Sequence, residues 1–213
     1  MRPGGAGRAA WGVALLALVA CDVGGPARVA TVSQTRGQAF ACRETFPADL
    51  TRCPAAAVGG EVGVNGGVAT GDGDSALVMQ SGSVAFRLEP QSALKYVANQ
   101  GAAASFLLSA GRLFASHESG SDTVVIRSGN VAVAELGTVY TVATNPSGVT
   151  VSVLSGSVAV EVPPGSNQKQ TVRAGEGVQV PPGATAPPPA RPMSPAEQRV
   201  WRQAGANPPP APP

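Results

Sequence analysis

The chain has few of the residues that make reactive or strongly charged surfaces. It holds one histidine, His117, and its 15 Lys and Arg residues nearly balance its 13 Asp and Glu residues. Sparse, balanced charge excludes the clustered basic face that nucleic-acid binding requires. Aromatic residues make up only 4% of the chain. This scarcity removes the usual stacking side chains of a carbohydrate cleft and favours a protein partner.

With a single histidine, the sequence offers little for catalysis. His117 stands in a polar stretch after a predicted strand, and we expect an exposed turn residue there rather than a general base. Asp72 and Asp74 could form a carboxylate pair or part of a calcium loop, but their spacing departs from the EF-hand pattern and suits a tight turn better. We therefore predict no enzyme, no catalytic residue, no metal site and no cofactor.

The N-terminus has the anatomy of an export signal. Two arginines precede an apolar run, residues 9–19, that is too short to form a permanent membrane-spanning helix. The run leads into Leu-Val-Ala-Cys at residues 18–21, which resembles the lipobox of bacterial lipoproteins. We therefore expect residues 1–20 to be removed as a signal peptide and Cys21 to become a lipidated N-terminus. An ordinary signal peptide followed by an incidental cysteine is the alternative.

Lipidation of Cys21 would decide where the rest of the protein acts. Two or more acyl chains hold a protein stably on a membrane, at about 0.8 kcal/mol per buried CH₂. Residues 21–27 would then be a short lipidated tether, and the remainder would face the periplasm or the cell surface. The expected partners are membrane lipid, bound through acylated Cys21, and other proteins of the cell envelope.

The other two cysteines make an even pair. Export would place Cys42 and Cys53 in an oxidising compartment, where disulfides form and persist. We predict a disulfide between them, within an N-terminal region, residues 28–67, that also contains a first strand. Two unpaired thiols are the alternative. A metal site is disfavoured because the histidine lies far away in sequence.

Glycines punctuate short β-branched runs between about residues 68 and 180, a pattern typical of an all-β fold. Five of these glycines, at positions 82, 111, 129, 156 and 175, are separated by 29, 18, 27 and 19 positions. The alternation of long and short spacings repeats about every 46 residues, which indicates stacked units. We predict a solenoid-like stack of short strands and hairpins, with a β-sandwich as the alternative. The best helical candidate inside this region is the segment Ser92 to Gln100.

The C-terminal region, residues 181–213, is rich in proline. We expect its flanking parts, residues 181–192 and 208–213, to be extended and largely disordered. Between them, Ser194, Pro195 and Glu197 supply an N-cap, a first-turn proline and the partner for a capping box. This pattern predicts a short helix near residues 195–204.

So short a helix does not persist alone in water. Its apolar residues Val200 and Trp201 must therefore dock on another surface. Trp201 is the candidate anchor for a partner, because aromatic residues dominate interface hot spots. The alternative is that the helix folds back on its own domain.

The glycine-punctuated region resembles the FecR domain family. Six blocks match the family's pattern in order: Thr70–Ala76, Val84–Leu94, Leu107–Leu113, Leu136–Val142, Val153–Val158 and Ala174–Val178. The resemblance covers roughly half the chain and implies an all-β, solenoid-like extracytoplasmic domain. The best-known members also carry a cytoplasmic segment that controls a sigma factor. We expect only the extracytoplasmic module to apply here.

Three functions are compatible with these features. The first is a non-catalytic recognition or scaffolding module of the cell envelope. The second is a signalling regulator that acts through a separate membrane-spanning partner. The third is a module that binds peptidoglycan or another polysaccharide.

Overall fold

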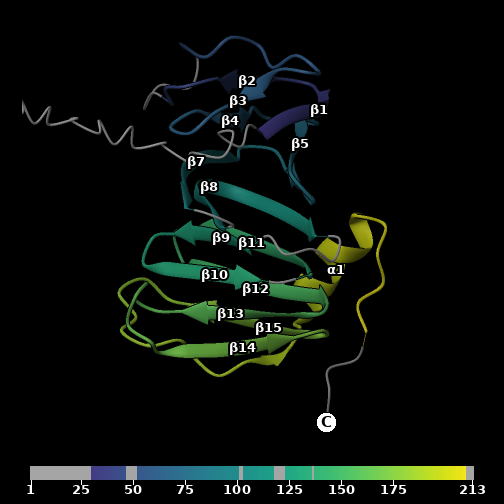
Figure 1. The fold of residues 1–213 in the computed structure, drawn as a ribbon. Helices are drawn as coiled ribbons and strands as arrows, with labels where there is room; N and C mark the ends of the chain where they lie inside the picture. Colours follow the sequence, from purple (N-terminus) through teal and green to yellow (C-terminus); the bar gives the residue numbers. More distant parts are fainter. Residues whose placement is uncertain (1–29, 47–51, 101–102, 118–122, 136, 210–213) are drawn as a thin grey trace, which may run out of the picture.

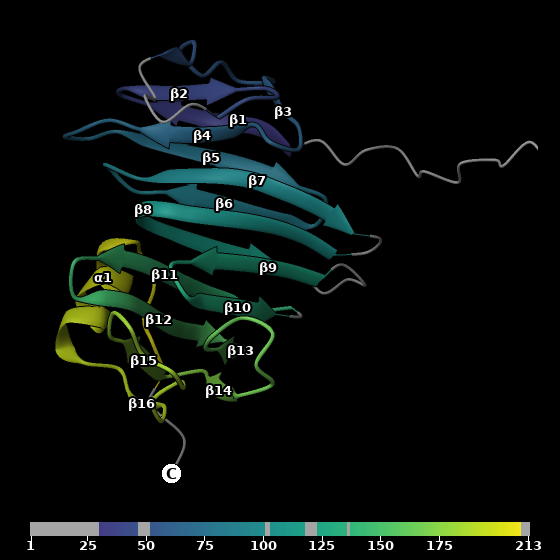
Figure 2. The same ribbon diagram turned by 90° about the vertical axis from the view of Figure 1, so that its left-hand side faces the viewer.

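The computed structural model describes residues 30–46, 52–100, 103–117, 123–135 and 137–209. Within these residues, strands stack nearly in sequence order from one end of the molecule to the other, and one short helix lies on one side (Figures 1 and 2). The all-β prediction is confirmed.

The stack consists of two sheets. Sheet A contains, in spatial order, β3 (Glu61–Val62), β1 (Ala30–Arg36), β5 (Ala76–Ser81), β6 (Val84–Leu88), β8 (Ala103–His117), β11 (Val139–Asn145), β12 (Gly148–Ser155), β15 (Glu176–Val180) and β16 (Arg191–Pro192). Sheet B contains β2 (Ala39–Cys42), β4 (Gly67–Thr70), β7 (Ala93–Gln100), β8, β9 (Thr123–Ser128), β10 (Val131–Glu135), β13 (Ser157–Glu161) and β14 (Lys169–Arg173). Every pairing is antiparallel except that of β8 with β9. The arrangement combines the stacking of a solenoid with the two layers of a sandwich.

The two sheets enclose one apolar core. Alternate residues of each strand point inward, as a period of two requires. Phe86 of sheet A and Phe106 of sheet B are both fully buried, and their ring centroids lie 4.7 Å apart. Each hairpin alone would bury little apolar surface, so the stack is stabilised by contacts between successive units.

The glycines of the predicted repeat have two different roles. Gly82 and Gly129 lie in tight turns of the hairpins β5–β6 and β9–β10. Gly111, Gly156 and Gly175 instead lie where the chain passes from one sheet to the other. The sequence pattern did not distinguish these two roles. The alternating spacing reflects the alternation between turns within a sheet and corners between sheets.

Gly111 lies at a corner inside a single strand. Phe106 and Leu113 both belong to β8, which pairs with β7 in sheet B up to Ala110 and with β11 in sheet A from Gly111. Gly111 has φ +77°, and a Cβ at this position would lie 2.6 Å from the backbone of Gln91 and Ser92. A side chain at this corner is therefore excluded by both conformation and space.

The segment from Ser92 to Gln100 is a strand, not the helix that we expected. Leu94 and Tyr96 are fully buried and point into the core, with Lys95 between them on the other face. This period of two matches a half-buried strand, and the helical propensity of the alanines and the leucine is overridden by packing.

The proline-rich segment 181–192 is also not the disordered tail that its composition suggested. Ala184 and Ala190 pack against the core, and the side-chain amide of Asn130 donates a hydrogen bond of 2.7 Å to the carbonyl oxygen of Ala184. The segment ends in β16, which pairs with β15. Proline-rich composition alone did not predict that this segment caps the last unit of the stack, as the terminal units of stacked repeats require.

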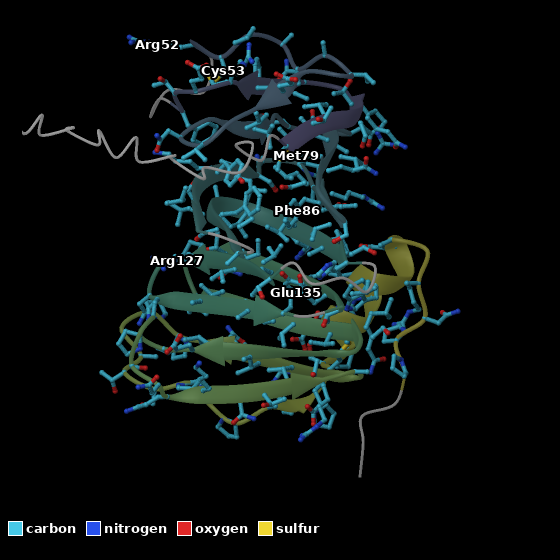
Figure 3. All side chains as sticks on the ribbon, viewed as in Figure 1. Arg52, Cys53, Met79, Phe86, Arg127 and Glu135 are labelled. Atoms are coloured by element: carbon cyan, nitrogen blue, oxygen red, sulfur yellow. A yellow bond between two sulfur atoms is a disulfide. The ribbon has the colours of Figure 1, made fainter. Side chains whose placement is uncertain are left out.

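Cys42 and Cys53 form a disulfide, as predicted, at the opposite end of the stack (Figure 3). The segment after Cys53 returns along β2, the edge strand of sheet B. Ala41 donates a backbone hydrogen bond to Pro54, and Ala56 donates one to Ala39. This segment thereby pairs with an edge that would otherwise be open to other strands.

Candidate recognition surface

The hydroxyl residues of the family-like blocks bind backbone groups at the corners between sheets. Ser92 Oγ donates to the carbonyl oxygen of Arg112 (3.0 Å) and accepts from the Arg112 N–H (2.9 Å). Thr70 Oγ1 donates to Glu89 (2.6 Å), and Thr138 Oγ1 donates to Ser157 (2.9 Å). These side chains satisfy buried backbone groups that leave the ladders at the corners. The blocks that carry the resemblance thus maintain the fold.

Asp72 and Asp74 lie in the turn before β5. The Asp72 backbone carbonyl accepts a hydrogen bond of 2.6 Å from Ser75 Oγ, and its carboxylate accepts one of 2.7 Å from the side-chain amide of Gln91. Gly73 between them has φ +65°. The two aspartates therefore stand in a hydrogen-bonded tight turn. Within the described residues, no group of three or more His, Cys, Asp or Glu side chains is arranged to hold a metal ion.

His117 is buried, so the expectation of an exposed turn residue is wrong. Its side chain and that of Glu135 have no exposed surface, and Nδ1 lies 3.0 Å from Glu135 Oε1. Nε2 lies 2.9 Å from the hydroxyl of Ser83, in the β5–β6 turn. The alternation Leu113, Ala115, His117 along β8 places the imidazole on the core face. That alternation was the sequence signal for its burial.

A serine, a histidine and a carboxylate in this order resemble the triad of a serine hydrolase. However, the His117 ring is enclosed by protein. The pair of His117 and Glu135 links the end of β8 to the corner between β10 and β11. Burial raises the pKa of Glu135, against the opposing effect of His117 and of the backbone of Thr138 and Gly137. The geometry fits a buried polar link between strands.

Tyr140 is buried in the core, close enough to Glu135 to be affected by its charge. Burial and the nearby charge of Glu135 raise the pKa of Tyr140 well above its ordinary value. The phenol therefore stays neutral across the physiological range.

The C-terminal helix, α1 (Pro195–Gln203), begins with the predicted capping box. Ser194 Oγ accepts a hydrogen bond from the Glu197 N–H (3.3 Å), and the Glu197 carboxylate accepts one from the Ser194 N–H (2.6 Å). Arg191 donates to the same carboxylate at 2.7 Å. Burial by itself would raise the pKa of Glu197, but the hydrogen bonds from Arg191 and Ser194 outweigh it and lower the pKa.

Helix α1 folds back on the outer face of sheet A (Figure 2). Trp201 is 2% exposed and meets the Phe114 ring edge-on, with centroids 5.2 Å apart. Its indole N–H donates to Ser152 Oγ at 3.1 Å. Of the two arrangements left open by the sequence, the structure shows docking in cis. Val200 is half-buried beside it.

An apolar groove runs along sheet A beside the helix. We call it the sheet A groove; it has a volume of about 260 Å³, and its lining includes Val78, Ala85, Phe114, Val139, Leu154 and Trp201. The first five residues come from five consecutive strands of the sheet, and Trp201 forms one wall. Arg87 lies at its edge, with the guanidinium carbon 5.3 Å from the centroid of the Phe114 ring. The sequence did not reveal this groove, because its residues come together only through the order of the strands.

The predicted signal peptide, the tether and Cys21 lie outside the residues that the structure describes. Lipidation of Cys21 therefore stays a prediction. In the part of the chain that is described, no helix is long and apolar enough to cross a membrane.

Comparison with known proteins supports the resemblance noted in the sequence. Residues 67–159 match the family model described as "FecR protein". No curated protein matches the chain. Two crystal structures, each described as a "putative anti-sigma factor" from Parabacteroides distasonis ATCC 8503, are similar to the chain.

The structure at 2.50 Å has 14% sequence identity and a TM-score of 0.52, with 63% of each chain covered. The structure at 1.65 Å has 16% identity and a TM-score of 0.47, with 57% of each chain covered. Less than two thirds of either relative is therefore matched, and at this identity the likeness concerns the fold alone. The family match covers residues 67–159, less than half of the chain, and makes this segment similar to the FecR family.

Proposed function

We propose that the mature protein is a lipid-anchored, extracytoplasmic FecR-domain protein that recognises another protein of the cell envelope without catalysing a reaction. The similarity of residues 67–159 to the FecR family is the observation that carries this proposal. The lipobox-like sequence ending at Cys21 supports both export from the cytoplasm and attachment to a membrane through lipid.

The chemistry of the described residues supports binding rather than catalysis. Its most reactive arrangement, Ser83, His117 and Glu135, has its imidazole and carboxylate fully enclosed. The hydroxyls of the family-like blocks are occupied with backbone groups of the corners. Among the exposed features of the described residues is the outer face of sheet A, which carries the sheet A groove.

Crosslinking in intact cells tests this proposal. The full chain, tagged at its C-terminus, should yield a reproducible crosslinked envelope protein when purified from membranes. The Cys21→Ser variant should lose its membrane attachment and the crosslinked product. A variant that remains membrane-bound would refute the lipid anchor. Recovery of no protein other than the chain itself would refute recognition of a protein partner.

A second candidate is a signalling regulator that works through a separate membrane-spanning partner. The anti-sigma description of the structure with a TM-score of 0.52 supports it. A crosslinked partner with a membrane helix and a cytoplasmic sigma-regulating segment would favour this function over simple scaffolding. Binding to peptidoglycan remains a third candidate, and failure to sediment with purified peptidoglycan would remove it.

A further inference from the structure

Helix α1 covers only part of the face on which it lies. Two of its nine residues, Glu197 and Trp201, are buried. The sheet A groove flanks it on one side, and a second groove of about 280 Å³, more polar in character, flanks it on the other. A single helix therefore leaves open surface along both of its sides.

The floor of the sheet A groove cannot take an added strand. It is formed by β5, β6, β8, β11 and β12, and each of these strands is already hydrogen-bonded to a neighbour on both sides. β-Augmentation needs an edge strand with free backbone groups. An occupant of this groove must instead pack side chains on the sheet, as α1 does.

The α1 contact shows which kind of element fits this face. A short amphipathic helix lies on sheet A through one large apolar side chain that rests on Phe114. The groove continues past Trp201 over the apolar residues Val78, Ala85 and Val139. A second helix beside α1 would extend the same mode of packing, since neighbouring helices lie 8–10 Å apart.

The part of the groove over β5 and β6 is basic. Arg87 is 43% exposed and pairs with Glu89 at 2.9 Å. A neighbouring pocket shares Val78 and Arg87 with the groove and adds Arg36, whose Nε donates to the Asp74 carbonyl oxygen. Arg36 and Arg87 line this pocket, and no acidic residue among those described lines it, which favours acidic groups on the occupant.

We propose that the sheet A groove binds an amphipathic helix of the envelope partner, with apolar side chains on Phe114 and Trp201 and acidic side chains near Arg36 and Arg87. This inference rests on the proposed function and specifies its binding site. Affinity would come from the apolar contacts in the centre, and the arginines would fix the direction of the helix.

A display library of amphipathic helices three to four turns long, with randomised charged positions, tests the groove directly. Selection on the mature protein should enrich helices with apolar residues at helical spacing and acidic residues toward one end. Leu154→Glu, which puts a charge in the groove, should weaken binding of the enriched helices at least about tenfold. Arg87→Gln should weaken it about two- to fivefold.

Gln80→Glu is the matched control, because Gln80 is an exposed residue of β5 that does not line the groove. It should bind like the wild type, and all variants should unfold at temperatures close to the wild-type value. Enriched helices that bind Leu154→Glu as well as wild type, or a library without enrichment, would overturn the groove assignment. If the C-terminal tail or a second copy of the chain displaces the selected helices from the groove, that segment or copy is the occupant, and the proposed partner helix is wrong.

The two proposals fail separately. An envelope protein that crosslinks to the full chain but competes with none of the selected helices would leave the proposed function standing and refute this binding site. Selected helices without a crosslinked envelope protein in cells would refute the proposed function.

Discussion

The two ends of the stack are covered by different chemistry. At the N-terminal end, the Cys42–Cys53 disulfide holds the chain where the segment after Cys53 pairs with the edge strand β2. At the C-terminal end, the proline-rich segment packs Ala184 and Ala190 against the core, and α1 continues from it onto the outer face of sheet A, where Trp201 meets Phe114. A covalent bond persists when the contacts around it open, whereas side-chain contacts exchange with other partners. The C-terminal cover is therefore the end suited to rearrangement beside a binding groove.

Removal of the indole should have the largest effect, and it should be confined to the C-terminal end. Trp201→Ala deletes the buried anchor of α1, at a cost of about 3–5 kcal/mol. A helix of this length does not persist undocked, so the amides of residues 197–203 should lose their protection from hydrogen exchange. Val200→Ala, which shortens a half-buried neighbour, should change this protection little. Equal protection in Trp201→Ala and wild type would show that the cover does not depend on Trp201.

Breaking the disulfide should destabilise the other end by a comparable but smaller amount. Cys42 and Cys53 are 11 positions apart, and closing so short a loop stabilises a protein by about 3 kcal/mol in the chain-entropy model. Reductant should lower the free energy of unfolding of the wild type, measured by denaturant titration. The double variant Cys42→Ala/Cys53→Ala should not respond to reductant. If reductant leaves the free energy of unfolding of the wild type unchanged, the disulfide does not stabilise the N-terminal end, and the contrast with the C-terminal end fails.

Between the two ends, corner and hairpin glycines should differ in their tolerance of a side chain. Gly111→Ala meets backbone at 2.6 Å in the left-handed region, and we expect a loss of about 2–4 kcal/mol. Gly129→Ala has the same type of backbone conformation, with φ +54°, but no atom within 4 Å of the new Cβ. It should cost about 1 kcal/mol. Equal losses in thermal unfolding would mean that crowding at the corner contributes nothing.

The sequence predicted local features better than it predicted their assembly. The β-branched runs, the capping box of Ser194 and Glu197, and the cysteine pair depend on neighbours in the chain, and the structure contains all of them. The corners could not be predicted, because Gly82 and Gly111 look alike in sequence and differ only in which sheet receives the next strand. The sheet A groove depends on the order of five strands, which no local pattern encodes.

The smallest effect should come from the ion pair that holds the C-terminal cover. The pKa of Glu197 is lowered in the folded protein, so its contribution to stability is present above the ordinary carboxyl pKa. It is lost as the pH falls through the folded-state pKa. Because Arg191 is 41% exposed, solvent screening limits the contribution to about 0.5–1 kcal/mol. Acidification below about pH 4.5 should therefore lower the protection factors of the α1 amides, that is, their protection after correction for the pH dependence of intrinsic exchange. Glu197→Gln should show faster exchange at neutral pH and little further loss of protection on acidification.

Because the disulfide does not titrate, the segment at residues 52–56 should keep its exchange rate relative to the core over the same range. Equal acid sensitivity at both ends would assign the effect to the whole stack instead of the C-terminal cover.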